Sequence, residues 1–322
     1  MQARAVLLRK IVNLVITLWA VWTLNFLLFH MLPGDPTHAL LPPRVPHDIA
    51  EKMKATFGLD KPLLEQYFIS LRTALSGDLG YSWFFKKPVF DIILYRLQYT
   101  LLLVGTGTFI TMAVGVKLGI IAGTNRGKAK DITIVGSSLA FYAMPAFWLA
   151  MIFLMTLAGD LDLFPLHGFR SYTGTSQTLV EEIADRLWHM VLPVLTFVLI
   201  TLSEFVLMMR SALIDVLTED YIATARATGL APNVIVRKHA VPNALIPTVA
   251  TFAMYIGWAV TGAIMIEIVF SWPGIGSLTW QALIQRDFPV LQGVFLIVAV
   301  TMLVANLVAD IAYTYIDPRV RL

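Results

Sequence analysis

Long apolar stretches, separated by shorter polar or proline- and glycine-containing stretches, make up most of the chain. Six of them reach the roughly 20 residues that a helix needs to cross the hydrocarbon core of a membrane. Their length, without strict apolar–polar alternation, favours helices over barrel strands, because a helix pairs its own backbone groups inside lipid. We predict these spans at residues 11–29, 100–123, 132–158, 190–209, 244–270 and 290–313.

Composition supports the same conclusion, because few residues carry charge. Hydrophobic residues make up 57% of the 322 residues and charged residues 14%, whereas an ordinary soluble domain has about 25% charged residues. The chain contains no cysteine, which excludes structural disulfides, thiolate metal sites and iron–sulfur ligation. Its six histidines lack the paired spacing of metal ligands, so we expect no metal site.

Lysine and arginine residues near the span ends indicate how the chain crosses the membrane. The N-terminal tail carries Arg4, Arg9 and Lys10 without an acidic residue, whereas residues 160–190 contain five acidic and two basic residues. Because basic loops stay on the cytoplasmic side, we expect both termini in the cytoplasm of a multi-pass protein of the plasma (inner) membrane. This topology accounts for the formal charge of +3, so no nucleic-acid partner is expected.

The predicted fold is an all-α polytopic membrane protein with six transmembrane helices in three regions. Residues 1–30 hold the cytoplasmic N-terminus and the first helix, residues 31–99 an external (periplasmic) helical segment, and residues 100–322 a core of five transmembrane helices. Within this core, a cytoplasmic loop at residues 210–243 joins the fourth helix to the fifth.

Two short helices are predicted in the external segment. Asp48 caps the first, which runs through Phe57. Residues 60–62 open the second, which ends at Gly77. Six apolar residues of the second helix recur at helical spacing, so we expect them to pack on neighbouring helices or on a partner. This stripe consists of Leu63, Leu64, Tyr67, Phe68, Leu71 and Leu75.

Ionisable residues are rare within the predicted spans and near their ends: Lys117, Glu204, Glu267 and Asp310. Each lies towards a span end, where contact with water lowers the cost of burying a charge. The sequence therefore lacks the midplane acids expected of a proton-coupled transporter. The polar residues Asn25, Glu204 and Asn306 are candidates for lining a solute pathway.

Two further patterns predict how the spans pack and where they are anchored. Gly115, Gly119 and Gly123 recur at every fourth position and predict a face on which another helix approaches closely. Four tryptophans near the predicted external ends are expected to anchor the chain at the membrane interface rather than to stack on a ligand. They are Trp83, Trp188, Trp272 and Trp280.

The segment from residue 210 to residue 243, hereafter the 210–243 loop, has the pattern of two helices around a sharp turn. Gly229 is suited to end the first helix, because the left-handed backbone conformation of such a turn favours glycine. Pro232 suits the first turn of the second helix, and Pro242 and Pro247 are expected to redirect the chain into the fifth span. Such a rigid knob can dock in the groove of a cytoplasmic partner. Alanines keep one surface of its first helix slim: Ala223, Ala225 and Ala227.

The 210–243 loop resembles the coupling loop, or EAA loop, of permeases in ATP-binding-cassette (ABC) importers. Gly229 and Pro242 keep the thirteen-residue separation that this family has between its glycine and its Leu-Pro proline. The Glu-Ala-Ala positions instead hold Ala-Thr-Ala at residues 223–225, and Val241 replaces the leucine. These departures are similar to the variant in the dipeptide, oligopeptide and nickel permease group.

Other stretches also resemble that group, and in particular its dipeptide permease B-type subunit, so that the resemblance covers nearly the whole chain. They are residues 32–36 (LPGDP), 57–62 (FGLDKP), 66–67 (QY), 77–80 (GDLG), 270–276 (FSWPGIG) and 317–319 (DPR).

The resemblance implies a set of partners. They are a second permease subunit, two cytoplasmic ATPase subunits whose grooves receive the coupling loops, and an external substrate-binding protein. A different chain is expected as the second permease, and a homodimer remains open. ATP and magnesium would bind to the ATPase subunits, so we expect no catalytic residue, cofactor or metal in this chain. The implied coupling residues are Tyr221, Thr224, Ala225, Arg226, Gly229, His239 and Pro242.

The function that follows is the import of di- or oligopeptides by alternating access, powered by ATP from the cytoplasmic side. Nickel, glutathione and oligosaccharides remain alternative substrates, because selection in this architecture resides largely in the binding protein. Two other classes of function also remain open. One is a channel or secondary transporter that works without ATP, and the other is a membrane scaffold without transport.

Overall fold

The computed structural model describes residues 2–31, 61–82, 84–171, 178–248 and 263–316. The chain divides into two compact units. The first comprises residues 1–99 and 274–303, and the second comprises residues 100–273 and 304–322.

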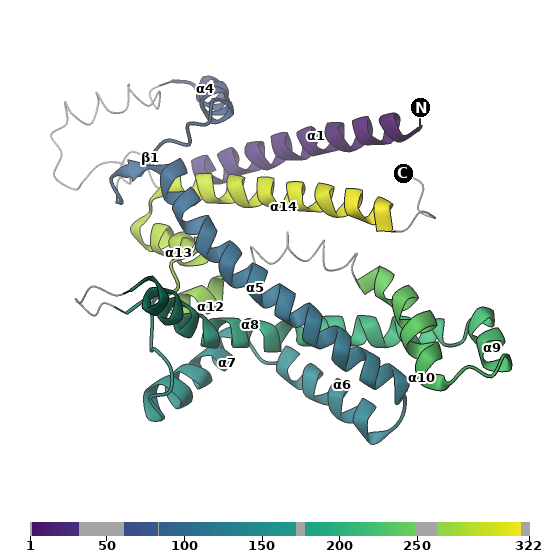
Figure 1. The fold of residues 1–322 in the computed structure, drawn as a ribbon. Coiled ribbons are helices and arrows are strands. Elements are labelled where there is room, and N and C mark those ends of the chain that lie inside the picture. The colour runs from purple at the N-terminus through teal and green to yellow at the C-terminus, as the bar shows by residue number, and fades with distance from the viewer. Residues whose placement is uncertain (1, 32–60, 83, 172–177, 249–262, 317–322) are drawn as a thin grey trace. The chain divides into compact units, whose positions relative to one another are not determined.

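The first unit holds α1 (Gln2–Met31), α4 (Leu63–Leu75) and a small hairpin of β1 (Tyr81–Ser82) and β2 (Lys87–Pro88). It also holds α13 (Ile275–Gln285) and the first parts of α5 and α14. The strands are antiparallel, with Tyr81 opposite Pro88 and Ser82 opposite Lys87. In Figure 1, α1 runs beside the first part of α14, to which Asn25 donates a hydrogen bond at Gln292.

The core of the first unit is an apolar cluster shared by three helices. Its residues come from the start of α5 (Val89–Thr124), from α13 and from the start of α14 (Phe288–Ile316). Gly293 permits a close approach here, because a Cβ atom at this position would lie 2.6 Å from Cγ1 of Val89. A buried hydrogen bond of 2.5 Å from the Ser82 hydroxyl to Asp287 also ties the hairpin to the start of α14.

The second unit is built around α8 (Leu179–Val216), against which α5 packs. It also holds α6 (Ala129–Tyr142), α7 (Ala146–Phe153), the π-helical turn η1 (Leu154–Asp160) and α12 (Ile264–Val269). Thr178 and Glu181 form a capping box that begins α8, with each side chain bonded to the backbone N–H of the other residue. The helix then continues through Pro193.

The predicted glycine face is confirmed, and its partner is α8. A Cβ atom at Gly115 would lie 2.6 Å from Cβ of Phe205, and one at Gly123 would lie 3.3 Å from the carbonyl oxygen of Arg210. A side chain at Gly115 would overlap Phe205, and one at Gly123 would be tighter than an ordinary van der Waals contact, so the two helices are in close contact along the glycine repeat.

Four of the predicted spans lie within helices long and apolar enough to cross a membrane, namely α1, α5, α8 and α14. The segment of the predicted span over residues 132–158 is apolar enough to cross a membrane, but it is a bent pair of helices and not one straight helix. The chain bends by 97° between α6 and the α7–η1 segment, because Pro145 cannot continue α6 and restricts the residue before it. The fifth predicted span, residues 244–270, includes 249–262, which lie outside the described residues. The count of six is thus not confirmed.

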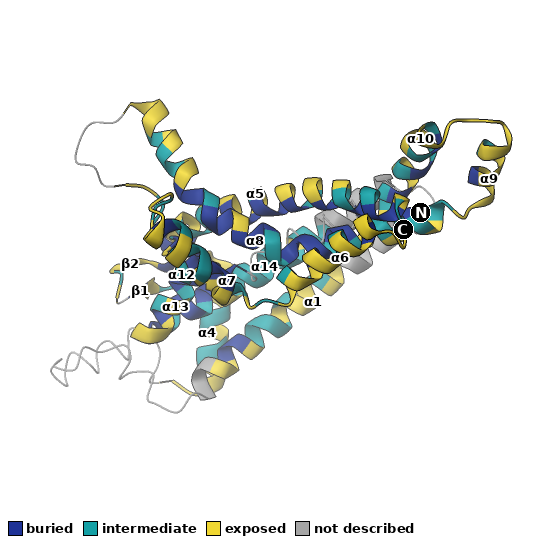
Figure 2. Cartoon of the chain, turned by 90° about the horizontal axis from the view of Figure 1, so that it is seen from below, coloured by how far each residue is buried: buried dark blue, intermediate teal, exposed yellow. Residues whose placement is uncertain are grey.

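Burial bears on two expectations about apolar side chains and corrects the one for Trp272 (Figure 2). Within the described part of the chain, α4 has no buried residue, and Leu64 and Leu75 are well exposed, so packing of this stripe on a partner stays a prediction. Tyr67 reaches α1, where its ring contacts Phe26 and its hydroxyl lies 2.8 Å from the Thr23 hydroxyl oxygen. Trp272 is fully buried, so it is no interfacial anchor. The helix expected from Asp48 and the side chain of Trp83 lie outside the described residues.

Candidate functional site

The 210–243 loop does not begin with one continuous helix. Its first residues still belong to α8, which ends at Val216, and α9 (Asp220–Ala227) starts after a short turn. In this turn the N–H of Glu219 donates to the carbonyl oxygen of Val216 at 3.1 Å. The loop therefore projects beyond the end of α8 as a separate helical piece (Figures 1 and 2).

Gly229 ends α9 in the predicted left-handed conformation. Its φ angle is +80°, and its N–H donates to the carbonyl oxygen of Arg226 at 3.0 Å. Thr228 reinforces the turn by donating its hydroxyl to the carbonyl oxygen of Ala225 at 2.9 Å. No heavy atom of the described residues lies within 4 Å of a Cβ built on Gly229. Glycine is therefore needed here for its backbone conformation and not for space.

The second helix of the loop begins as predicted but does not end as predicted. Pro232 is the first residue of α10 (Pro232–Val234), which continues into the π-helical turn η2 (Ile235–Ala240) and then into helical residues 241–248. The chain remains helical through Pro242, contrary to expectation, whereas the residues just after Pro247 that would show a redirection lie outside the described residues. The wide turn of η2 ends at Ala240, two residues before Pro242, and Pro242 has no N–H to donate, so the helix can accommodate that proline.

An apolar core fixes the two helical pieces of the loop onto α8. Ile222 is the buried residue of α9, and Ile235 and Ala240 are the buried residues of η2. They form one cluster with Met209 and Leu213 of α8 and with Ala244, and all six are nearly or fully inaccessible to solvent. Because interiors are close-packed, such a cluster makes the loop move as a body with the end of α8.

Most predicted coupling residues lie on the outer surface of this core. Tyr221, Thr224, Arg226, Gly229 and Pro242 are exposed, and Ala225 and His239 are half-buried. One polar contact joins the two sides of the loop, since Nδ2 of Asn243 lies 3.1 Å from the Tyr221 hydroxyl and donates to the carbonyl oxygen of His239 at 2.8 Å. The structure thus brings Tyr221 and His239 close to the same asparagine.

The predicted pathway residues have different environments. Asn25 is buried and donates from Nδ2 to the carbonyl oxygen of Gln292 at 3.0 Å, which gives it a structural role between α1 and α14. Glu204 and Asn306 are half-buried on α8 and α14. A pathway role for these three residues stays a prediction.

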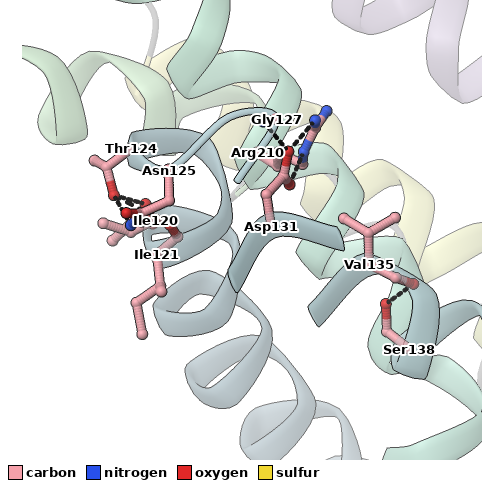
Figure 3. Close-up of polar contacts among 9 residues, drawn as sticks. All are labelled: Ile120, Ile121, Thr124, Asn125, Gly127, Asp131, Val135, Ser138 and Arg210. Carbon is pink, nitrogen blue, oxygen red and sulfur yellow. Dashed lines mark hydrogen bonds and ion pairs between the residues drawn. The ribbon is translucent and has the colours of Figure 1, made fainter. Parts of the chain in front are cut away.

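Two buried polar contacts were missed by sequence reasoning. Asp131 accepts two hydrogen bonds from Arg210, at 2.6 Å from Nε and 2.7 Å from Nη2 (Figure 3). Glu267 is fully buried and accepts a 2.7 Å hydrogen bond from the Thr100 hydroxyl. For the first pair, the sequence shows an acid and a base at the ends of two predicted spans, but the two residues lie 79 positions apart, so the sequence alone does not indicate that they pair.

Among the described residues, no group of three or more His, Cys, Asp or Glu side chains is arranged to hold a metal ion.

These features define a membrane protein of several apolar helices, with a compact helical knob at the end of one of them. The sequence pattern described as "Binding-protein-dependent transport system inner membrane component" matches residues 115–322. The pattern described as "Binding-prot-dependent transport system membrane comp, N-term" matches residues 4–104.

Curated relatives match over nearly their whole length. The dipeptide transport system permease protein DppB of Escherichia coli (strain K12) is 35% identical, covering 98% of both chains. The oligopeptide transport system permease protein AppB of Bacillus subtilis (strain 168) is 33% identical over 98% of this chain and 99% of its own. The glutathione transport system permease protein GsiC of Escherichia coli (strain K12) is 34% identical over 98% of both.

Solved structures agree at the level of the fold. A chain of the inward-facing MetNI methionine ABC transporter has a TM-score of 0.56 at 17% identity, over 70% of this chain and 96% of its own. The protein belongs to the binding-protein-dependent transport system inner membrane component family, whose members here are permease subunits of ABC importers. The resemblance on which the sequence analysis relied is thereby confirmed.

Proposed function

We propose that this permease subunit imports di- or oligopeptides across the plasma membrane by alternating access. The observation that carries a peptide substrate is the chain's 35% identity, along nearly its whole length, to a dipeptide permease. Nickel, glutathione and oligosaccharides are the alternative substrates. Glutathione is supported by the 34% identity of the chain to a glutathione permease. A second permease chain and an external substrate-binding protein would complete the pathway.

The 210–243 loop, facing the cytoplasm, would dock in a groove of an ATPase subunit. Its buried side, Ile222 and Ile235, gives it rigidity, and its exposed side offers Tyr221, Thr224 and Arg226 to a partner. Exposed tyrosine and arginine residues are the types that most often dominate binding energy at interfaces. The ATPase subunits would bind ATP and magnesium, and their closure would move the loop and shift the permease towards its outward-facing state.

Reconstitution tests the function directly. The chain is tagged, purified in mild detergent from its native membranes with whatever accompanies it, and placed in liposomes with the binding protein from the same cells. Uptake of a labelled dipeptide is then compared with uptake of nickel, glutathione and an oligosaccharide, each with ATP and with a non-hydrolysable ATP analogue.

Each outcome of this experiment points to a different function or substrate. ATP-dependent uptake of the dipeptide, with ATPase subunits in the preparation, supports the proposal. ATP-dependent uptake of another solute alone replaces the substrate and keeps the mechanism. Uptake that needs no ATP, in a preparation without ATPase subunits, identifies a channel or secondary transporter instead. An intact preparation that moves none of these solutes, with or without ATP, favours a scaffold.

A further inference from the structure

The pairing of Asp131 with Arg210 has the geometry of a rigid link rather than of a loose surface ion pair. Two nearly parallel bonds join the guanidinium to the carboxylate, and Oδ2 of Asp131 also accepts from the N–H of Gly127 at 2.9 Å (Figure 3). Asp131 is buried and Arg210 is partly so. A planar guanidinium held by two bonds fixes orientation as well as distance, which a lysine ammonium does not.

One end of this link is the turn between α5 and α6. Gly127 has a φ angle of +77° in that turn, and Asp131 lies in the first turn of α6. Nδ2 of Asn125 donates to the carbonyl oxygen of Ile121 at 2.9 Å, which fastens the turn to the end of α5 (Figure 3). Any force on the Asp131 carboxylate therefore reaches both α5 and α6.

The other end of the link is the turn of α8 from which the 210–243 loop starts. Met209 and Leu213, on either side of Arg210 in the sequence, belong to the apolar cluster that holds Ile222 and Ile235 of the loop. The same turn of α8 thus contacts the loop through its apolar residues and contacts α6 through Arg210.

We propose that Asp131 and Arg210 are positioning residues that couple the 210–243 loop to α6, so that a displacement of the loop moves α6 and α8 together. This inference rests on the proposed function, because it assigns the link to the transmission of ATPase closure. Helix α6 is followed by the 97° bend before α7, so a tilt of α6 would reorient the α7 segment as well.

Conservative substitutions distinguish transmission from simple structural support. Arg210→Lys keeps the positive charge but cannot form the paired hydrogen bonds to the carboxylate. Arg210→Gln removes the charge and the paired bonds. Asp131→Asn keeps the shape of the side chain and removes its negative charge. Lys130→Gln is the matched control, because Lys130 is an exposed cation of the same helical turn. For each variant, the measurements are the ratio of ATPase subunits to permease after purification, ATPase activity without the binding protein, ATPase activity with it, and solute taken up per ATP hydrolysed.

The expected result is normal assembly and normal unstimulated ATPase activity for Arg210→Lys and Asp131→Asn. Stimulation by the binding protein and uptake per ATP should fall about tenfold, in the usual range of a coupling between two sites. Arg210→Gln should lose at least as much, and Lys130→Gln should behave like the unmodified protein.

Two results overturn the proposal. In the first, stimulation and uptake per ATP stay at the level of the unmodified complex in all variants. In the second, assembly falls in step with uptake, including in Arg210→Lys, so that each remaining complex works normally and the pair is only structural. Failure of the proposed function is recognised separately, because the unmodified chain would then purify without ATPase subunits.

Discussion

Gly119 of α5 lies directly against Met209 of α8. A Cβ atom on Gly119 would be 2.7 Å from Cβ of Met209 and 2.8 Å from the carbonyl oxygen of Val206. A backbone carbonyl of a helix has little freedom to retreat, so the two helices can keep this spacing only with glycine at position 119. Because Met209 also belongs to the core under the 210–243 loop, the contact helps to hold the base of the proposed coupling site.

Replacing Gly119 with leucine should destabilise the second unit. We expect a cost of about 1 to 3 kcal/mol from overpacking, seen as a lower midpoint of thermal unfolding for the chain in detergent. Gly105→Leu is the matched control on the same helix, because nothing among the described residues lies within 4 Å of a Cβ at that position. Equal midpoints for the two variants would contradict the close packing of α5 on α8.

Gly229→Val should damage the 210–243 loop without preventing insertion. The residue has a φ angle of +80° and open space around its Cβ position, so the cost of about 1 to 2 kcal/mol comes from the left-handed backbone alone. The expected result is a normal amount of chain in the membrane, with reduced uptake and reduced stimulation of ATP hydrolysis.

Two further variants make this test specific to the backbone. Gly229→Asn should retain more activity than Gly229→Val, since asparagine tolerates the left-handed conformation better. Gly136→Val replaces an exposed glycine of α6, which has no close neighbour among the described residues, and should leave activity unchanged. Full uptake and normal ATPase stimulation in Gly229→Val would show that the turn is not needed for coupling.

Sequence reasoning predicted the structure best where a local property of one residue type, such as the missing side chain of glycine, decides the outcome. The glycine repeat predicted a close helix contact, and the left-handed turn at Gly229 followed from the conformational freedom of glycine. It failed at Pro145 and Pro242, which have the same local chemistry but different outcomes. The chain bends at Pro145 and remains helical through Pro242. The difference depends on the π turn before Pro242, which local sequence does not specify.

Contacts between residues far apart in the sequence are the second kind of feature that sequence reasoning did not predict. Glu267 was expected near a span end, where water would relieve its charge, yet it is buried against Thr100, which lies 167 positions earlier. Trp272 was expected at the interface because tryptophan is common there, yet its ring packs edge-on against Phe169. Both depend on which helix ends meet, and the pattern within one segment does not contain that information.

Thr100→Val should destabilise the contact between the start of the second predicted span and α12. Valine has nearly the shape of threonine but donates no hydrogen bond, so the carboxyl oxygen of Glu267 loses the 2.7 Å bond from the hydroxyl. We expect a loss of about 1 to 2 kcal/mol, measured as a lower thermal midpoint in detergent. Thr100→Ser, which keeps the hydroxyl, should remain closer to the unmodified chain. If serine and valine are equally destabilising, packing rather than the hydrogen bond is responsible.

Substitutions of Tyr221 can distinguish the docking of the 210–243 loop on an ATPase subunit from the hydrogen bonding inside the loop. The residue is 43% exposed, and its hydroxyl accepts a hydrogen bond from Nδ2 of Asn243 at 3.1 Å. Tyr221→Phe removes only that bond, which at an exposed position contributes about 0.5 to 1 kcal/mol, so the loop should keep its shape and its partner. Tyr221→Ala also removes the exposed ring, and an aromatic residue at the centre of an interface contributes about 2 kcal/mol or more.

The measurement for Tyr221 is the amount of ATPase subunit that co-purifies with the tagged chain, compared across increasing salt concentrations. We expect Tyr221→Phe to retain the ATPase and Tyr221→Ala to lose most of it at every salt concentration, because an apolar contact is screened little by ions. Asn243→Ala is the control for the internal bond, since it removes the same partner while keeping the ring. Equal retention by all three variants would mean that the ATPase docks without this ring. Loss in Asn243→Ala but not in Tyr221→Ala would assign the contact to the asparagine instead.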